Sequence, residues 1–390
     1  MTGSEVTGSE EPATEEPATE VTASPVTASE TPIAADSTPS DPSRGAAVEA
    51  RTTAGMVCAH HHLYSALARG MPAPPRTPTG FLEILELVWW RLDRALDLDI
   101  IEWSAKLGAL EALESGTTAI IDHHESPNAI EGSLDVIAAA CAEVGVRADC
   151  SYGVTDRHGA AGARAGLAEN DRFLRSGGRG HVGVHAAFTC SEDTLQAAAG
   201  LAADHGTGVH IHVAEGSADR AAGERLATLA RDDWLLVHAV HLDRDLPGTI
   251  IHNPRSNMNN AVGYAMPAAR PNPVALGSDG IGAAMVEEFQ LAYARHREDD
   301  VTATPETAWS WLETGWRLFP EAAHDTVIWN CGRLDAWSLA FTTGVKAQDV
   351  TVDGEVVLRD GRPTRVDGDE IRTKAAEAAA RLFAKLEDMP

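Results

Sequence analysis

The sequence is poor in basic residues relative to acidic ones. It has 31 Lys and Arg against 58 Asp and Glu, which gives a formal net charge of −27 at pH 7. Because proteins bind the phosphates of nucleic acids with clustered Lys and Arg, this balance argues against a nucleic-acid partner. Part of the charge is local, since residues 1–50 hold ten acidic residues and one basic residue, Arg44.

Paired cysteines, long apolar runs and a leader segment are also missing. The five cysteines are scattered and form no CxxC pair, which is typical of reduced thiols rather than of a disulfide framework. No apolar run is long enough to span a membrane, and the N-terminus lacks the basic and apolar regions of a signal peptide. We therefore expect a cytoplasmic protein with no membrane contact.

Eight short apolar runs recur from residue 56 onward, and several are followed by stretches rich in Ala, Leu and Glu. Continuous apolar strands that alternate with helices indicate parallel strands buried on both faces. Eight such units predict an α/β fold, a closed (β/α)₈ barrel of TIM type. The runs are MVCAH (56–60), TTAIIDH (117–123), VRADCSY (146–152), HVGVHAAF (181–188), GVHIHVAE (208–215), WLLVHAVHL (234–242), GTIIHNP (248–254) and VALGSDG (274–280).

Amphipathic stretches between and after these runs predict the helices. The connections after the sixth and seventh runs are too short or too rich in proline for full helices, so we expect an incomplete outer ring there. Residues 349–363 predict a β-hairpin that turns at Asp353-Gly354. The predicted helices span 99–114, 128–144, 160–176, 191–205, 217–231, 283–298, 305–318 and 369–387.

The domain organisation follows from a change of composition near residue 45. The first 45 residues repeat TGSE, EPATE and VTAS, and such small, polar, acidic segments cannot bury enough apolar surface to offset the entropy of ordering. We expect a disordered acidic tail over 1–45 and the barrel over 46–340. A small β-hairpin with a C-terminal helix, a reduced remnant of a β-sandwich, is expected over 341–390.

Residues that bind metals or move protons stand where the predicted strands end, which is where barrel active sites lie. His60 and His62 are two positions apart on one strand, so both imidazoles point to the same side. His212 and Asp279 follow from two other strands. Three imidazoles and a carboxylate suit one divalent ion, with Zn²⁺ expected first and Fe²⁺ as the alternative.

Further residues at these strand ends fit the chemistry of such an ion. A bound ion lowers the pKa of water toward ~7 and so supplies hydroxide at neutral pH. Glu215 lies three residues after His212 and is placed to shuttle a proton between water and substrate. We expect His238 to hydrogen-bond the attacking water and Asp279 to take its first proton. We interpret the other histidines near the strand ends, His61, His123 and His124, and also His205, as structural.

Several motifs in order resemble the amidohydrolase superfamily. They are AGMVCAHHHLYSALARGM, HIHVAE, LLVHAVHL, IIHNPRSN and LGSDG, and they are most similar to the branch of cyclic-amidine deaminases and triazine chlorohydrolases. TTAIIDHHESPNAIEGSLDVIA, GVTDRHG, VHAAFTCS and HNPRSNMNNAVGY look more narrowly like the SsnA-like aminohydrolases. The resemblance runs from about residue 52 to 300.

The resemblance implies a barrel with His60, His62, His212 and Asp279 as ligands, Glu215 as proton shuttle and His238 as the residue that orients water. It also implies that His185 contacts the substrate, and it suggests Arg69 and Asn253 as further pocket residues. Binuclear relatives carry a bridging lysine where His185 stands, so one ion is expected. The sequence departs from the family at its N-terminus, where the acidic tail replaces the usual sandwich strands.

These observations predict hydrolytic deamination of an aminated nitrogen heterocycle, such as a purine, a pterin or a triazine. The same hydroxide also serves dechlorination, loss of an alkylamine or opening of a cyclic amide, and these alternatives stay open at this point. A non-catalytic homologue on a trimmed scaffold is a third hypothesis. The expected partner is the small heterocyclic substrate, and a homodimer is an open possibility.

Overall fold

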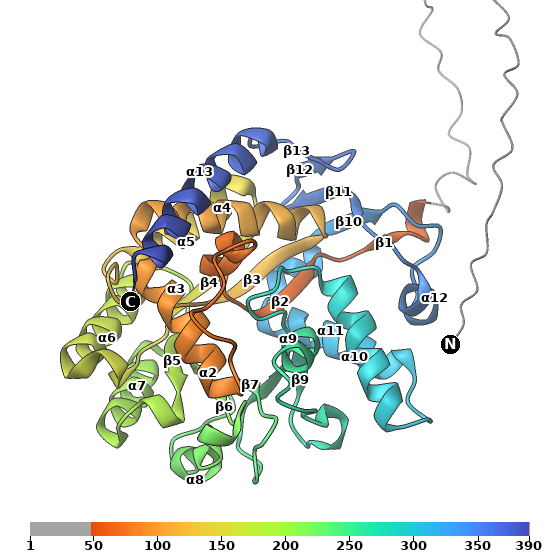
Figure 1. The fold of residues 1–390 in the computed structure, drawn as a ribbon. Coiled ribbons are helices and arrows are strands. Elements are labelled where there is room, and N and C mark those ends of the chain that lie inside the picture. The colour runs from red at the N-terminus through yellow and green to blue at the C-terminus, as the bar shows by residue number, and fades with distance from the viewer. Residues whose placement is uncertain (1–47, 390) are drawn as a thin grey trace, which may run out of the picture. The chain divides into compact units, whose positions relative to one another are not determined.

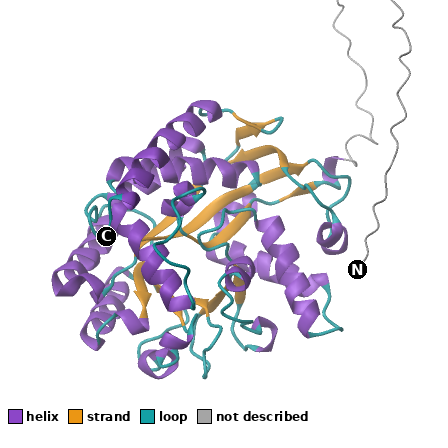
Figure 2. Cartoon of the chain, viewed as in Figure 1, coloured by secondary structure: helices purple, strands orange, loops and turns teal. Residues whose placement is uncertain are grey.

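The computed structural model describes residues 48–389, so the predicted tail over 1–45 lies outside the described residues (Figure 1). Residues 48–389 cluster as one compact unit. The predicted boundary at residue 340 stays a prediction. Within the described part, helices surround a central set of parallel strands, and a separate antiparallel sheet lies to one side of them (Figure 2).

The barrel has the eight parallel strands that the sequence predicts. Strands β2 to β4 form one sheet and β5 to β9 another. Single parallel bridges, His61 to Asp279 and Val154 to Val184, join the two sheets at both edges and close the cylinder. The strands are β2 (Met56–His61), β3 (Thr117–His124), β4 (Arg147–Tyr152), β5 (Val182–Ala186), β6 (Val209–Val213), β7 (Leu235–His238), β8 (Thr249–His252) and β9 (Val274–Leu276).

The predicted helices of the ring are confirmed with one exception. Helices α4 (Leu98–Glu114), α5 (Ser133–Val144), α6 (Gly159–Arg175), α7 (Glu192–His205), α10 (Met285–Asp299), α11 (Pro305–Leu318) and α13 (Gly368–Glu387) match the amphipathic stretches. The long helix predicted over 217–231 is wrong, because only a 3₁₀ turn at Ser217–Asp219 and the short α8 (Ala222–Leu226) form. The Asp219 carboxylate accepts hydrogen bonds from the backbone N–H of Ala214 and Phe188, which ties this segment to the strand ends.

The ring is trimmed where the sequence predicts. Between β7 and β8 the described chain has no helix, and after β8 only α9 (Pro254–Asn259) and a 3₁₀ turn at Pro267–Ala269 follow. Two helical segments were not predicted. Before α4, α2 (Phe81–Ile84), a π-helical turn (Leu85–Trp89) and α3 (Trp90–Ala95) run on from one another, and α12 (Ala336–Phe341) follows β10 (Thr326–Trp329).

The small sheet combines both ends of the described chain. Its antiparallel order is β1 (Thr52–Thr53), β10 (Thr326–Trp329), β11 (Ala347–Val352), β12 (Glu355–Arg359) and β13 (Arg362–Pro363). The predicted hairpin is β11–β12, with Asp353 and Gly354 both in the left-handed region, as a tight hairpin turn requires. The N-terminal side contributes only the two residues of β1, so the sandwich is reduced as predicted.

No helix among residues 48–389 is long and apolar enough to cross a bilayer.

A buried ion pair fastens the small sheet to the barrel. Arg147 on β4 donates to both oxygens of Asp325, at 2.5 and 2.9 Å, and the Asp325 side chain is 1% exposed. Removing one member of a buried pair leaves the other charge unpaired. We therefore expect Asp325→Ala to lower the free energy of unfolding by about 3 kcal/mol.

A urea titration followed by circular dichroism measures this loss. The control is Glu298→Ala, which removes the exposed carboxylate that pairs with Arg295 at 2.8 Å on α10. That surface pair contributes less than about 1 kcal/mol. Equal midpoints for the two variants would show that the Arg147–Asp325 pair does not hold the sheet.

Candidate active site

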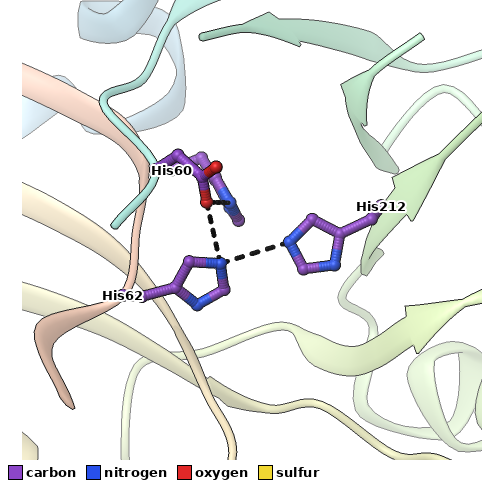
Figure 3. Close-up of side chains that lie close together, drawn as sticks. His60, His62 and His212 are labelled. Atoms are coloured by element: carbon purple, nitrogen blue, oxygen red, sulfur yellow. Dashed lines mark hydrogen bonds and ion pairs between the residues drawn. The ribbon is translucent and has the colours of Figure 1, made fainter. Parts of the chain in front are cut away.

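Four predicted ligands meet at the C-terminal ends of the barrel strands. His60 lies on β2, His62 directly after it, His212 on β6 and Asp279 after β9. One ligand atom of each lies within 4.8 Å of those of the others. Figure 3 shows the imidazoles of His60 and His62, from one chain segment, converging with that of His212, from another strand. The register between β2 and β3 shifts between Cys58 and His61, an irregularity of the kind that re-aims side chains beside active sites.

The atoms that converge are all ring Nε2 atoms and one carboxylate oxygen. Asp279 Oδ1 lies 3.3 Å from His60 Nε2 and 3.0 Å from His62 Nε2. His62 Nε2 and His212 Nε2 lie 3.3 Å apart. The other oxygen of Asp279 accepts a hydrogen bond from the Ser256 hydroxyl at 2.5 Å.

The hydrogen bonds on the far side of two rings fix where their protons sit. His62 Nδ1 lies 2.5 Å from the backbone oxygen of His123, and His212 Nδ1 lies 2.7 Å from that of His185. A carbonyl oxygen only accepts, so both Nδ1 atoms carry the proton. When the rings of His62 and His212 are neutral, their Nε2 atoms carry no proton, and the two lone pairs face each other.

A longer chain of hydrogen bonds fixes the third ring. The Ser151 hydroxyl donates to the backbone oxygen of Asp122 at 2.9 Å, so its oxygen is left to accept from His210 Nδ1 at 3.1 Å. His210 Nε2 must then accept from His60 Nδ1 at 2.8 Å. His60 therefore also presents an unprotonated Nε2 to Asp279.

This arrangement fits a cation. Three lone pairs and a carboxylate oxygen would repel one another if nothing positive lay between them, and orienting partners on Nδ1 are usual for metal-binding histidines. Burial lowers the pKa of His62, but the Asp279 carboxylate outweighs burial and raises it to about 9, so the place between these side chains attracts positive charge, which a proton supplies where a metal ion does not. The histidines and the carboxylate thus have the composition of a divalent-metal site.

Glu215 and His238 stand beside the four ligand residues. His238 Nε2 lies 3.4 Å from Glu215 Oε2 and 3.9 Å from Asp279 Oδ2. His238 Nδ1 donates to Asn257 Oδ1 at 2.8 Å, so Nε2 is free to accept a proton from a water molecule. Burial and the charge of Asp279 raise the pKa of Glu215 well above its usual value, so this carboxyl can carry a proton at neutral pH.

The three residues suggested for substrate binding lie in different places. His185 lines the pocket and is held by Thr189 through a 2.7 Å hydrogen bond. Asn253 is fully buried behind His238, with its Nδ2 3.4 Å from His238 Nδ1, and it does not line the pocket. Arg69 is not brought to the site: its side chain is 66% exposed and pairs with Glu111 on α4 at 2.5 Å.

Three of the four predicted ligands, His62, His212 and Asp279, line one pocket at the mouth of the barrel. The helical segment before α4, missed by the sequence analysis, lines it on one side through Phe81, Leu82, Leu85, Trp89 and Trp90. A Cβ on Gly216, the residue after Glu215, would come within 2.5 Å of the Phe81 ring. The lack of a side chain at position 216 therefore lets this aromatic segment close over the proton carrier.

The sequence is similar to proteins named as deaminases. A 5′-deoxyadenosine deaminase of Methanopyrus kandleri is 29% identical over 385 residues, which cover 84% of this chain and 86% of that protein. A 5-methylthioadenosine/S-adenosylhomocysteine deaminase of Desulforudis audaxviator is 28% identical over 395 residues, which cover 85% and 86%.

Solved structures share the fold. An adenosine deaminase from Xanthomonas campestris with bound zinc superposes with a TM-score of 0.71 at 20% identity, over 85% of this chain and 86% of that one. An atrazine chlorohydrolase from Arthrobacter aurescens, complexed with zinc, gives 0.65 at 19% identity, over 84% and 88%. These likenesses confirm the predicted barrel.

Residues 52–313 match the amidohydrolase family, and the chain belongs to that family. The match confirms the predicted class of enzyme, a metal-dependent hydrolase that acts on carbon–nitrogen bonds.

His210 is the residue that the sequence analysis overlooked, and its orienting role can be tested. We expect His210→Leu to weaken Zn²⁺ binding about 10- to 100-fold, because the partner that keeps the proton on His60 Nδ1 is lost. Competition with a chromophoric chelator measures the affinity. The matched control is His124→Leu, since His124 is also buried but bonds to Ser126 at 2.8 Å instead of to a ligand residue. Equal zinc affinities in the two variants would contradict the role.

Proposed function

We propose that this amidohydrolase removes the exocyclic amino group of an adenine-like heterocycle by hydrolysis, with one Zn²⁺ held by His60, His62, His212 and Asp279. The observation that carries the proposal is the convergence of three imidazole Nε2 atoms and a carboxylate oxygen beside Glu215, whose raised pKa lets it carry a proton. The deaminases of adenine nucleosides among the relatives support the substrate class. A histidine at position 185, where binuclear relatives have a bridging lysine, supports a single ion.

The bound ion would acidify a water molecule, so that hydroxide is available at neutral pH. The protein's own side chains orient the water and move the protons. His238 Nε2 accepts a hydrogen bond from the attacking water and orients it. Asp279 Oδ2, 3.9 Å from His238 Nε2, is placed to take the proton that the water loses. The new carbon–oxygen bond forms at the ring carbon that bears the amino group.

Glu215 moves protons on the substrate side of the same carbon. Its raised pKa lets it protonate the ring nitrogen next to the attacked carbon, which makes that carbon more electrophilic. The amino group takes up the proton held by Asp279 and leaves as ammonia when the carbon–nitrogen bond breaks, and the hydroxyl proton of the added oxygen returns to Glu215 as the carbonyl forms. The aromatic side chains of the segment 81–90 provide an apolar wall on which a flat heterocycle can stack.

Metal removal tests the first part of the proposal. We expect dialysis against a chelator to abolish ammonia release from 5′-deoxyadenosine and one equivalent of Zn²⁺ to restore it. Metal removal also exposes the repulsion between the lone pairs, so the melting temperature should fall by several degrees. Full activity at a metal content near zero, or recovery that needs two equivalents, would contradict a single essential ion.

A substitution at Glu215 tests the proton carrier. Gln is of equal size but cannot donate or accept the transferred proton, so we expect Glu215→Gln to lower kcat by about 100-fold or more. The zinc content should stay unchanged, because Glu215 is not among the four ligands. Glu224→Gln, a change of the same charge at an exposed position on α8, is the control. A Glu215→Gln enzyme with full kcat would exclude the role.

A further inference from the structure

The pocket lining is strongly one-sided in charge. Of the described residues that line it, five are carboxylic acids and none is Lys or Arg. Asp279 belongs to the ligand set, Glu215 carries a proton, and Asp219 is saturated by two backbone N–H groups at 2.7 and 2.8 Å. The other two, Asp93 and Glu125, have no part in the chemistry proposed above.

Asp93 and Glu125 face a single guanidinium. Arg157 bonds to Glu125, and its Nη2 lies 3.4 Å from Asp93 Oδ2. Its other face is covered, since the guanidinium carbon lies 4.3 Å from the centre of the Trp90 ring. Two carboxylates against one cation leave a formal charge of −1 when both are ionised.

Both carboxyls are buried, so a second negative charge here is costly. The side chains of Asp93 and Glu125 are 2% and 5% exposed, and Asp93 Oδ1 has no hydrogen-bond partner. Burial raises the pKa of both carboxyls against the opposing effect of Arg157, and the charge of Asp93 adds to the rise at Glu125, to about 8. A buried acceptor with no partner costs free energy, which a donating or cationic ligand group would recover.

His185 lies between the candidate metal ligands and the Asp93–Glu125 pair. The His185 ring centre lies 5.6 Å from that of His212, and its Nε2 lies 3.6 Å from Glu125 Oε1. Glu125 therefore lies on the side of His185 that faces away from the candidate metal ligands. A heterocycle with its amino-bearing carbon at the ion would direct its opposite end toward this wall.

We propose that Asp93 and Glu125 form a recognition subsite for a cationic substituent of the substrate and exclude substrates that carry an anion there. The inference rests on the proposed deamination, whose substrate it narrows to heterocycles with a positive or neutral distal group. The tail of S-adenosylhomocysteine carries both an ammonium and a carboxylate, so only one of its two charged groups suits this wall. Nucleotides, with their phosphates, fit it worse.

Three adenine nucleosides that differ only at the 5′ position test the subsite. They are 5′-amino-5′-deoxyadenosine, 5′-deoxyadenosine and adenosine-5′-carboxylate, which present an ammonium, a methyl group and a carboxylate. Calorimetry on the zinc-loaded enzyme gives the dissociation constants, and ammonia release gives kcat/KM. We expect the ammonium compound to bind at least about tenfold more tightly than the carboxylate compound, as a desolvated charge pair would give.

Variants separate recognition from a structural role. Asp93→Asn and Glu125→Gln each leave one carboxylate for Arg157, and each should reduce the tenfold preference to about threefold or less. A cluster that only supports the fold would weaken the binding of all three compounds by the same factor. Glu86→Gln, at an exposed position of the same helical segment, changes the net charge equally and should keep the preference.

The outcomes also distinguish this inference from the proposed function. Binding in the expected order without ammonia release would support the subsite and contradict the proposed deamination. Ammonia release at equal kcat/KM from all three compounds would support deamination and overturn the subsite. An anion that binds as tightly as the cation, or no binding by any of the three, would also overturn it.

Discussion

The site depends on the pairing that closes the barrel between its first and last strands. The backbone N–H groups of Ser278 and Asp279 both donate to the backbone oxygen of His60, at 3.0 and 3.2 Å. His62 N–H lies 3.4 Å from the backbone oxygen of Asp279. These contacts bring a carboxylate from one end of the barrel sequence against two imidazoles from the other. Asp279 takes a left-handed backbone conformation to do so, with φ at 57°, which an L-residue adopts only at a cost.

Burial then gives the histidines the protonation state that a metal requires. Burial and the neighbouring rings lower the pKa of His60, His210 and His212, so these imidazoles are neutral at pH 7 and can offer a lone pair. The hydrogen bonds on the Nδ1 side choose which nitrogen offers it. Because two of those bonds end on backbone carbonyls of neighbouring strands, the fold itself sets the tautomer of the ligands.

The sequence predicted what depends on local pattern. Each of the eight strands is a continuous apolar run, and the ligands stand where these runs end, so both could be read from composition and spacing. His210 could have been found in the same way, since it stands two positions before His212 just as His60 stands before His62. It was missed because only the residues at the mouth were considered, although the barrel interior below them holds their partners.

Features that depend on long-range packing could not be read in this way. Arg69 follows a strand end in the sequence, but its partner Glu111 lies on an outer helix, and no local pattern reveals that pairing. The helical segment over 81–95 has apolar residues around most of its surface, because it covers the pocket on one side and packs on the protein on the other. Such a segment lacks the single apolar stripe by which surface helices are recognised.

The two ends of the pocket impose opposite demands on a ligand. At one end, three imidazole nitrogens and a carboxylate favour a cation, which a bound divalent metal ion would supply. At the other end, Asp93 and Glu125 exceed the charge of Arg157, and in the absence of a ligand only a proton can balance them, at the cost that burial imposes on a charged group. Replacing either acid with an apolar residue would remove that cost and still leave Arg157 a partner. A protein that keeps both acids beside its substrate pocket therefore forgoes stability at a place where charge can select the ligand.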